Sequence, residues 1–223
     1  MCFILCVTRR LLGDRKRITQ PQSPSRSAKL RWRDPLFVAC QCNHLEVAEE
    51  LIKQGADVHT QMVDGATPLF IAAQNGHLKM LKFLISKGAR ADMKRKDGAS
   101  PLWIASQMGH VGVVQELLAN GADIDSPRED GATPLFKAAH KGHLDVVQEL
   151  LKHNASLGLL QNGESALHAA ALFGHAKVVK ELITAGAQRE LKNKEGQTAA
   201  ELAKEAGYEH IASFLDNPEN FQS

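Results

Sequence analysis

The sequence predicts an all-α solenoid of six helix-turn-helix units joined by β-hairpin-like finger turns. The motif Asp-Gly-Ala-Thr-Pro-Leu-Phe at residues 64–70 returns almost unchanged at 97–103 and 130–136, and in weaker form from residues 162 and 195. Its glycines recur at steps of 33, 33, 32 and 33 residues. A fixed period in this range is typical of stacked supersecondary units, each of which needs its neighbours to bury its apolar face.

Each helix of a unit has a start signal and a stop signal. Thr133 supplies a hydroxyl that caps free N–H groups, and Pro134 suits the first helical position because it loses no hydrogen bond there. Gly142 ends this first helix, because glycine adopts backbone conformations that other residues avoid. A second helix follows and ends at Asn154. Its apolar residues are spaced as in a helix rather than a strand: Leu144, Val146, Val147, Leu150 and Leu151.

The pattern DGxTPLxxAAxxGHxxVVxxLLxxGAD resembles the ankyrin repeat, because the turn, the caps and the period all agree with that family. The resemblance covers residues 34–216 and implies a non-catalytic array that binds other proteins. The six expected units are 34–63, 64–96, 97–129, 130–161, 162–194 and 195–216.

Two departures from the family pattern bear on packing. The histidine of the family's Thr-Pro-Leu-His motif survives only as His168, and aromatic packing between repeats is expected where Phe37, Phe70, Trp103 and Phe136 replace it. In the first unit, Asn43 stands for the glycine between the helices. Asparagine tolerates that backbone conformation better than most residues, so the helix pair is still expected to form.

The chain divides into an N-terminal arm (1–33), the repeat array (34–216) and a short tail (217–223). The arm has nine Lys or Arg residues and one acid, a net charge of +8 within a total of +2, which leaves −6 for the remainder. Residues 19–27 are rich in Pro, Ser and Gln and are predicted to be disordered.

Four roles stay open for the arm. It is a solvated tail, a mitochondrial transit peptide, a nuclear import signal around residues 15–17, or a membrane anchor acylated at Cys2 and Cys6 beside Arg9 and Arg10. Apart from peripheral contact through the arm, no membrane association is expected, because the sequence has no run of 18 apolar residues. The four cysteines do not resemble a disulfide framework. We therefore expect a cytoplasmic monomer with reduced thiols.

Three constellations resemble catalytic or metal sites, and none is expected to act as one. The histidines of the Gly-His pairs lie too far apart on successive helices to share a metal ion. We expect them to form local hydrogen bonds at the helix turn. Residues 158–165 superficially resemble a phosphate loop, but Glu164 replaces its lysine. Cys40 and His44 lack an orienting partner. We predict no cofactor, no metal ion and no enzymatic activity.

In the family, the finger tips and the ends of the first helices line a concave groove, and we expect a protein partner to bind there. Leu172 and Phe173 either form an exposed apolar cluster with Leu160 or pack under the shortened fourth finger. Charges on the second helices, Glu149 among them, are expected to form a solvated convex face. The candidate groove residues are Lys94, Lys96, Met108, His140, Lys141, Leu160, Leu172 and Phe173.

The sequence thus predicts a protein-interaction adaptor or scaffold. Two alternatives stay open within the same class: an inhibitor-type ankyrin protein that masks a transcription factor, and an adaptor tethered to a membrane through the arm. Nucleic acid is a disfavoured partner, although the basic arm and Trp32 could support such binding, which would weaken with rising salt.

Overall fold

The computed structural model describes residues 34–161 and 163–217. This part of the chain contains twelve helices and no strand. The arm and most of the C-terminal tail, and with them Cys2 and Cys6, lie outside the described residues. The helices are α2 (Pro35–Gln41), α3 (Leu45–Lys53), α4 (Pro68–Gln74), α5 (Leu78–Ser86), α6 (Pro101–Met108), α7 (Val111–Ala119), α8 (Pro134–Lys141), α9 (Leu144–Lys152), α10 (Ala166–Leu172), α11 (Ala176–Thr184), α12 (Ala199–Glu205) and α13 (Glu209–Asp216).

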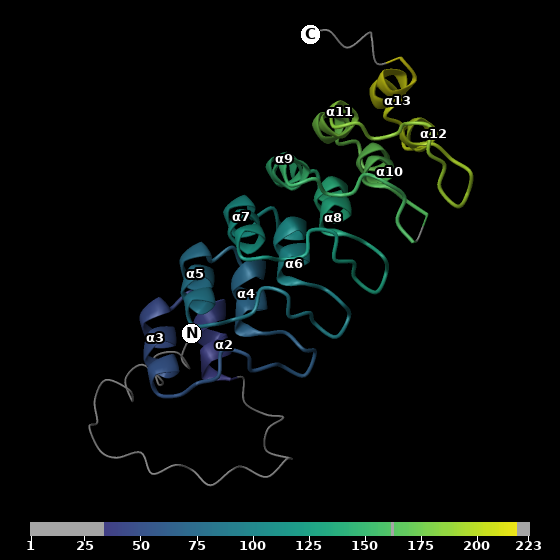
Figure 1. The fold of residues 1–223 in the computed structure, drawn as a ribbon. Coiled ribbons are helices and arrows are strands. Elements are labelled where there is room, and N and C mark those ends of the chain that lie inside the picture. The colour runs from purple at the N-terminus through teal and green to yellow at the C-terminus, as the bar shows by residue number, and fades with distance from the viewer. Residues whose placement is uncertain (1–33, 162, 218–223) are drawn as a thin grey trace.

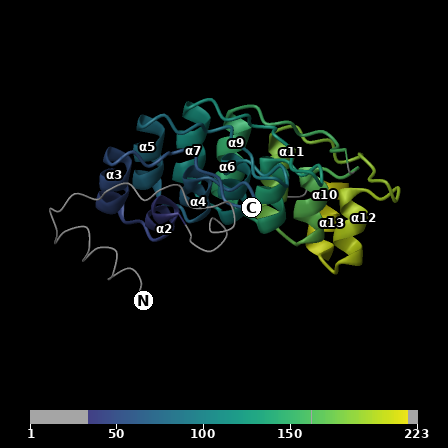
Figure 2. The same cartoon turned by 90° about the horizontal axis from the view of Figure 1, so that it is seen from below.

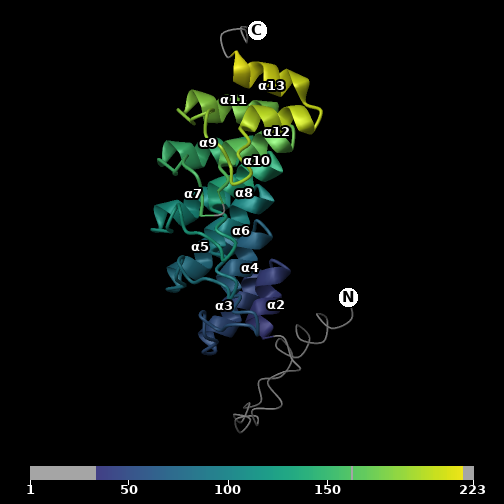
Figure 3. The same ribbon diagram turned by 90° about the vertical axis from the view of Figure 1, so that its right-hand side faces the viewer.

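The helices form two parallel rows. The first helices of the units (α2, α4, α6, α8, α10, α12) make one row, and the second helices (α3, α5, α7, α9, α11, α13) make the other (Figure 1). Seen from below, the two rows form an arch, and a side view shows the units stacked in chain order from α2 to α13 (Figures 2 and 3). The predicted all-α solenoid of six helix pairs is confirmed.

The helix caps form as the sequence predicts. The Thr133 side chain accepts a hydrogen bond from the backbone N–H of Phe136 at 3.3 Å, and Thr67 and Ser100 cap α4 and α6 in the same way. Gly142 ends α8 with φ of 75°, and Asn43 adopts φ of 57° at the equivalent place in the first unit. The asparagine therefore replaces glycine in the left-handed region without breaking the repeat.

The fingers are closed by backbone hydrogen bonds rather than by regular strands. The Arg95 N–H donates to the Ala99 carbonyl at 2.8 Å. The Leu160 N–H donates to the Glu164 carbonyl at 2.7 Å, so the fourth unit closes its finger although it is one residue short. Consecutive fingers are also linked: the Lys96 N–H donates to the Asp64 carbonyl at 2.9 Å.

The core is a continuous ribbon between the two rows. Leu69, Leu102 and Leu135 occupy the same position in successive first helices and are almost completely buried. The small residues Ala73, Ser106 and Ala139 repeat further along these helices and are also buried. Small side chains at this position let the backbones of neighbouring units approach closely, which fixes the stacking.

The convex face is less solvated than the sequence suggests, and the expectation for Glu149 is wrong. Its side chain is largely buried and accepts a hydrogen bond from Gln115 of the preceding unit at 3.1 Å. The same contact recurs between Lys82 and Glu116 and between Gln148 and Glu181. Glu149 therefore belongs to a polar row that connects the second helices of neighbouring units.

We predict that the first unit frays before the central units. Its second helix buries only Ala48 completely, whereas α9 buries Val146, Val147 and Leu150. In an array stabilised by nearest neighbours, the unit with the smaller interface opens at lower free energy. Hydrogen exchange should therefore be faster in residues 35–55 than in residues 133–151. Equal protection of the two segments would contradict this.

Candidate functional site

The ends of the first helices place several candidate residues on one edge of the array. Met108, Lys141 and Phe173 stand at or just after the last residues of α6, α8 and α10, each directly before the glycine that turns the chain. The first helices of neighbouring units pack side by side (Figure 1). Because the three residues lie at equivalent helix ends, they form a row along the array. The side chains of Met108 and Phe173 are 46% and 44% exposed.

An open hollow of about 350 Å³ is lined by residues of α8, α10 and α12 and of the two fingers that precede α8 and α10. The Phe173 and His140 rings lie against each other with centroids 4.2 Å apart, and Leu172 beside them is 37% exposed. Apolar side chains dominate its lining, with Lys137, Asp130 and Glu164 among the polar groups at its wall. The full lining is Asp130, Ala132, Phe136, Lys137, His140, Glu164, His168, Ala169, Leu172, Phe173 and Leu202.

The surroundings of His140 at this hollow favour the neutral form of its ring. Burial lowers the pKa of its ring, and the nearby charges of Lys137 and Lys141 lower it further. Its buried Nδ1 has no hydrogen-bond partner within the described part of the chain. A neutral imidazole against Phe173 presents an aromatic surface to a ligand rather than a charge.

The prediction that Leu160 belongs to the exposed apolar cluster is wrong. It is half-buried and packs against Ala132, Phe136 and Ala169. Leu172 and Phe173, in contrast, remain exposed rather than packing under the shortened finger. Of the three residues, these two offer the most apolar surface to a partner.

The predicted basic residues are not part of the hollow. Lys94 and Lys96 are exposed on the finger that precedes α6. That finger is joined to the next one by the bond from the Glu129 N–H to the Asp97 carbonyl, 3.0 Å long. Since Asp130 at the hollow follows Glu129 directly, the lysines lie one finger away from the hollow. They can contact only a partner that extends over several units.

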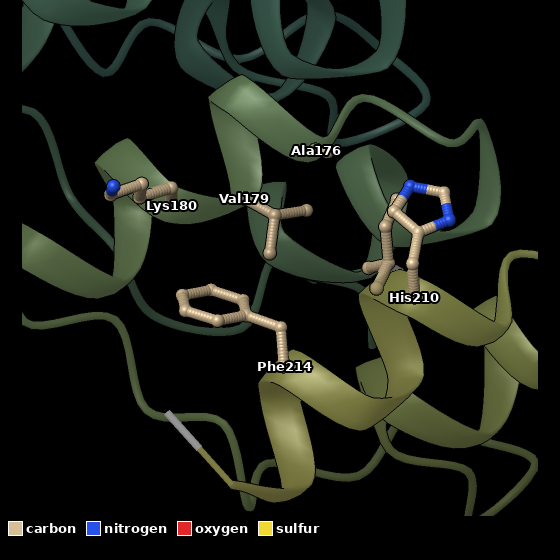
Figure 4. Close-up of a pocket in the computed structure, with 6 residues that line it drawn as sticks. Ala176, Val179, Lys180, His210 and Phe214 are labelled. Carbon is tan, nitrogen blue, oxygen red and sulfur yellow. The ribbon is translucent and has the colours of Figure 1, made fainter. Parts of the chain in front are cut away.

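A second hollow lies between α11 and α13, near Val179, His210 and Phe214 (Figure 4). It measures about 10 Å³, which is space for about one water molecule. The view shows the Phe214 ring of α13 pointing toward Val179 of α11. We interpret it as a packing gap of the last helix pair and not as a binding site.

The period, the glycine-ended first helices and the linked fingers together specify a known family. The family model described as "Ankyrin repeats (3 copies)" matches residues 10–97, 36–128, 69–160, 102–193 and 155–221. The chain belongs to the ankyrin repeat family. Ankyrin repeats are generally protein–protein interaction modules and are typically non-catalytic. No curated protein matches the chain significantly.

In residues 34–161 and 163–217 of this ankyrin chain, no helix has the length and apolar character needed to cross a membrane. The same ranges contain no group of three or more His, Cys, Asp or Glu residues arranged to hold a metal ion.

The histidines of the ankyrin Gly-His pairs bond between units, so the expectation of local bonds is wrong. The ring Nε2 of His143 lies 3.0 Å from the Gln107 carbonyl oxygen, at the end of the preceding first helix. His77, His110 and His175 repeat the contact with Gln41, Gln74 and His140 at 3.1 Å each. These histidines therefore hold consecutive ankyrin units together.

Sequence reasoning missed a row of cations that cover aromatic rings. Arg95 lies over the Phe70 ring and Arg128 over the Trp103 ring, both at 5.3 Å, and both pair with Asp97. The hydrogen bond from Arg95 holds the pKa of Asp97 well below its usual range. A signal for this row was present, since an arginine precedes the Asp-Gly turn by two residues in both fingers.

Aromatic packing at the former histidine positions is confirmed, but it does not replace every hydrogen bond. Phe70, Trp103 and Phe136 are buried as expected. Trp103 also donates from its indole Nε1 to the Ala132 carbonyl of the next unit at 2.8 Å. His168 makes the corresponding contact, with its Nε2 lying 3.2 Å from the Gln197 carbonyl oxygen.

The two remaining constellations have structural roles. Cys40 is buried in α2, and this burial raises the pKa of its thiol to about 12. The thiol is therefore protonated and unreactive at neutral pH. The segment that resembles a phosphate loop is the fourth finger, and its Ser165 caps α10 by accepting from the His168 N–H.

Lowering the pH should destabilise the fifth unit through His168. Its Nδ1 accepts from the Ser165 N–H at 3.2 Å, and burial lowers the pKa of the ring from the ordinary 6.5. The unfolded chain therefore binds the proton more readily. The stability contributed by the neutral ring is complete above pH 6.5 and is lost as the pH falls through the lower folded pKa.

Thermal melts of the wild type and of His168→Phe, taken from about pH 8 to about pH 5, check this prediction because histidine titrates in that range. Phenylalanine is the matched replacement, since Phe136 occupies the same position in the fourth unit. The variant should lose less stability than the wild type on acidification. Identical pH dependence in the two proteins would count against the role of His168.

Proposed function

We propose that this ankyrin array is an adaptor or scaffold that binds a protein partner on the edge formed by its first-helix ends and fingers. The observation that carries the proposal is the exposed pair Leu172 and Phe173 at a hollow of about 350 Å³. Contiguous apolar surface rimmed by polar residues is typical of interaction sites. The aromatic pair of Phe173 and His140 gives the site the side-chain type that dominates interface energies.

The charges favour one class of partner. Exposed Lys141 follows His140 directly, and exposed Lys94 and Lys96 lie on an earlier finger. A partner with an apolar anchor in the hollow and acidic residues near Lys141 of the fourth unit and Lys94 and Lys96 of the second would match this arrangement. Complementary charge at the edge of such an interface governs the rate and orientation of binding more than its strength.

Reversing the two finger charges, with Lys94→Glu and Lys96→Glu, is expected to slow association and to reduce its dependence on salt. Both side chains are exposed, so the substitutions should leave folding unchanged. Association rates measured at several salt concentrations check this expectation. An unchanged rate, or an increase in the dissociation rate alone, would show that the lysines do not steer the partner.

Affinity capture with the full chain tests the function itself. The proteins retained by the wild type are compared with those retained by a Leu172→Ser, Phe173→Ser double variant. Val63→Ser is the matched control, because Val63 is 71% exposed but lies on the first finger, outside the hollow. A partner bound by the wild type and the control, but not by the double variant, supports the proposal. Equal retention by all three proteins rejects the hollow as the binding site.

Within the family, we propose a narrower resemblance to ankyrin repeat domain-containing protein 29. It rests on the sequences of residues 101–110 and 156–170, PLWIASQMGH and SLGLLQNGESALHAA. The inhibitor-type role and the tether through Cys2 and Cys6 remain alternatives. Release from membranes on replacing both cysteines by serine would support the tether.

A further inference from the structure

The N-terminal end of the array leaves two apolar side chains partly uncovered. Val47 and Leu51 on α3 are only half-buried. The residues at the same two positions of all later second helices are buried to 3% exposure or less. These residues are Met80, Val113, Val146, Val178 and Ile211 at the first position, and Leu84, Leu117, Leu150, Leu182 and Leu215 at the second. Within the described residues, these two positions are partly exposed only in the first unit, which has no preceding unit packed against it.

A carboxylate at the same end occupies a position that contacts the preceding unit elsewhere in the array. In three consecutive interfaces, a glutamate of the second helix bonds to a donor on the preceding second helix. The pairs are Glu116 with Lys82 at 3.2 Å, Glu149 with Gln115 at 3.1 Å, and Glu181 with Gln148 at 3.0 Å. The first unit has Glu50 at this position. Glu50 accepts a hydrogen bond at 2.9 Å from Gln54, which directly follows the same helix, and not from a preceding unit. A donor located before Asp34 would complete the row.

The histidine row ends in the same way. Each later histidine of this row lies 3.0–3.1 Å from a carbonyl oxygen of the preceding unit. The His44 ring has no such acceptor among the residues that the structure describes. The first unit therefore presents apolar, acidic and hydrogen-bonding groups in the positions that elsewhere contact a preceding unit.

A second copy of the chain would fit this end poorly. At the other end of the array, Glu209 and Asp216 on α13 occupy positions that are apolar in the earlier second helices, such as Leu45 and Ile52. In the register of the other interfaces, stacking the last unit of one copy on the first unit of another would place Ser213 opposite Glu50. It would also bring Glu209 and Asp216 to positions where the earlier second helices carry apolar residues. Burying charged groups at these positions without partners disfavours such a contact.

We propose that residues 29–33 of this chain, Lys-Leu-Arg-Trp-Arg, cover the exposed end of the first unit. Leu30 and Trp32 supply apolar surface for Val47 and Leu51, and the three cations supply a donor for Glu50. The charges are complementary, since α3 has three acidic residues and the segment has none. Residues 1–28 are not needed for this contact.

The distance along the chain permits the contact. The helices α2 and α3 are joined by residues 42–44 and pack against each other, so the start of α2 lies beside the last turn of α3, where Glu50 and Leu51 are found. Five extended residues span about 17 Å. The match of the ankyrin family model to residues 10–97 begins upstream of α2, so the matched range includes residues 29–33.

Tryptophan fluorescence tests the proposal in the full chain. The protein has two tryptophans, and Trp103→Phe leaves Trp32 as the only one. This background is conservative, because phenylalanine occupies the same position in the neighbouring units at Phe70 and Phe136. Acrylamide is the quencher, because a neutral molecule does not respond to the charge of the segment. We expect Trp32 to be shielded from acrylamide at every protein concentration.

Two variants should remove this shielding: Leu51→Asp, which makes the apolar contact polar, and Glu50→Lys, which reverses the paired charge. Glu46→Lys is the matched control, because it changes the same charge on an exposed turn of the same helix and should retain the shielding. If Leu51→Asp fails to fold, Glu50→Lys decides alone, since Glu50 is exposed. The proposal is overturned if Trp32 is freely quenched in the parent protein, if Glu50→Lys leaves it shielded, or if shielding grows with concentration, which would indicate a second copy.

Discussion

Replacing Phe173 by alanine is expected to weaken partner binding by roughly 2 kcal/mol or more, the usual range for an aromatic hot spot. The side chain is 44% exposed and contacts the His140 ring at the rim of the hollow. It can therefore be removed without opening a cavity in the core, and the melting temperature should not change. The measurement is the dissociation constant for the captured partner, together with a thermal melt of the free protein.

Val63→Ala provides the comparison, because it also removes exposed apolar surface but lies outside the hollow. It should change neither quantity. If Phe173→Ala instead lowers the melting temperature and leaves binding intact, Phe173 is a packing residue and the proposed site is wrong.

Replacing Leu150 by alanine is expected to destabilise the array by about 2–5 kcal/mol, the range measured when a fully buried leucine is truncated. Leu150 is completely buried and lies at the interface of the fourth unit with its neighbour. In a nearest-neighbour array, the loss affects the helix pair and its interfaces rather than a single side chain. Denaturation with urea, followed by circular dichroism, gives the change in the free energy of unfolding.

Leu151 is the matched control for this substitution. It follows Leu150 directly on α9 but is only half-buried, so Leu151→Ala should cost clearly less. Similar losses at both positions would show that burial at the unit interface does not determine the stability of this region. Two separate unfolding transitions in either variant would show that the array no longer unfolds as one unit.

The local structure of each unit could be predicted from short stretches of sequence. Thr133 and Pro134 start α8, Gly142 ends it in the left-handed conformation, and Asn43 adopts the same conformation in the first unit. These features depend on hydrogen bonds and dihedral angles within a few residues of the chain. Their sequence signals are therefore complete in themselves.

Contacts between units were predicted less well. The bond from His143 to the Gln107 carbonyl, the burial of Glu149 beneath Gln115, and the packing of Leu160 against Phe136 all differ from the sequence-based expectation. Each joins residues more than 20 positions apart. Whether such a side chain meets solvent or another unit depends on the offset between stacked helices, which no single unit encodes.

The candidate site shows the same division. The sequence identified the helix-end positions of His140, Leu172 and Phe173, because the repeat register assigns each residue a place on the unit. Only the tertiary structure showed that two of them remain exposed around one hollow, that Leu160 does not, and that Lys94 and Lys96 lie one finger away.

The sequence by itself determined the family, the number of units and the residues that start and end each helix, because these follow from a period and from local backbone chemistry. The tertiary structure decided which side chains hold the units together and which are left for a partner. The physical reason is that exposure is a property of the stacked array: the same leucine position is buried at Leu150 and half-buried at Leu51, depending on whether a preceding unit covers it.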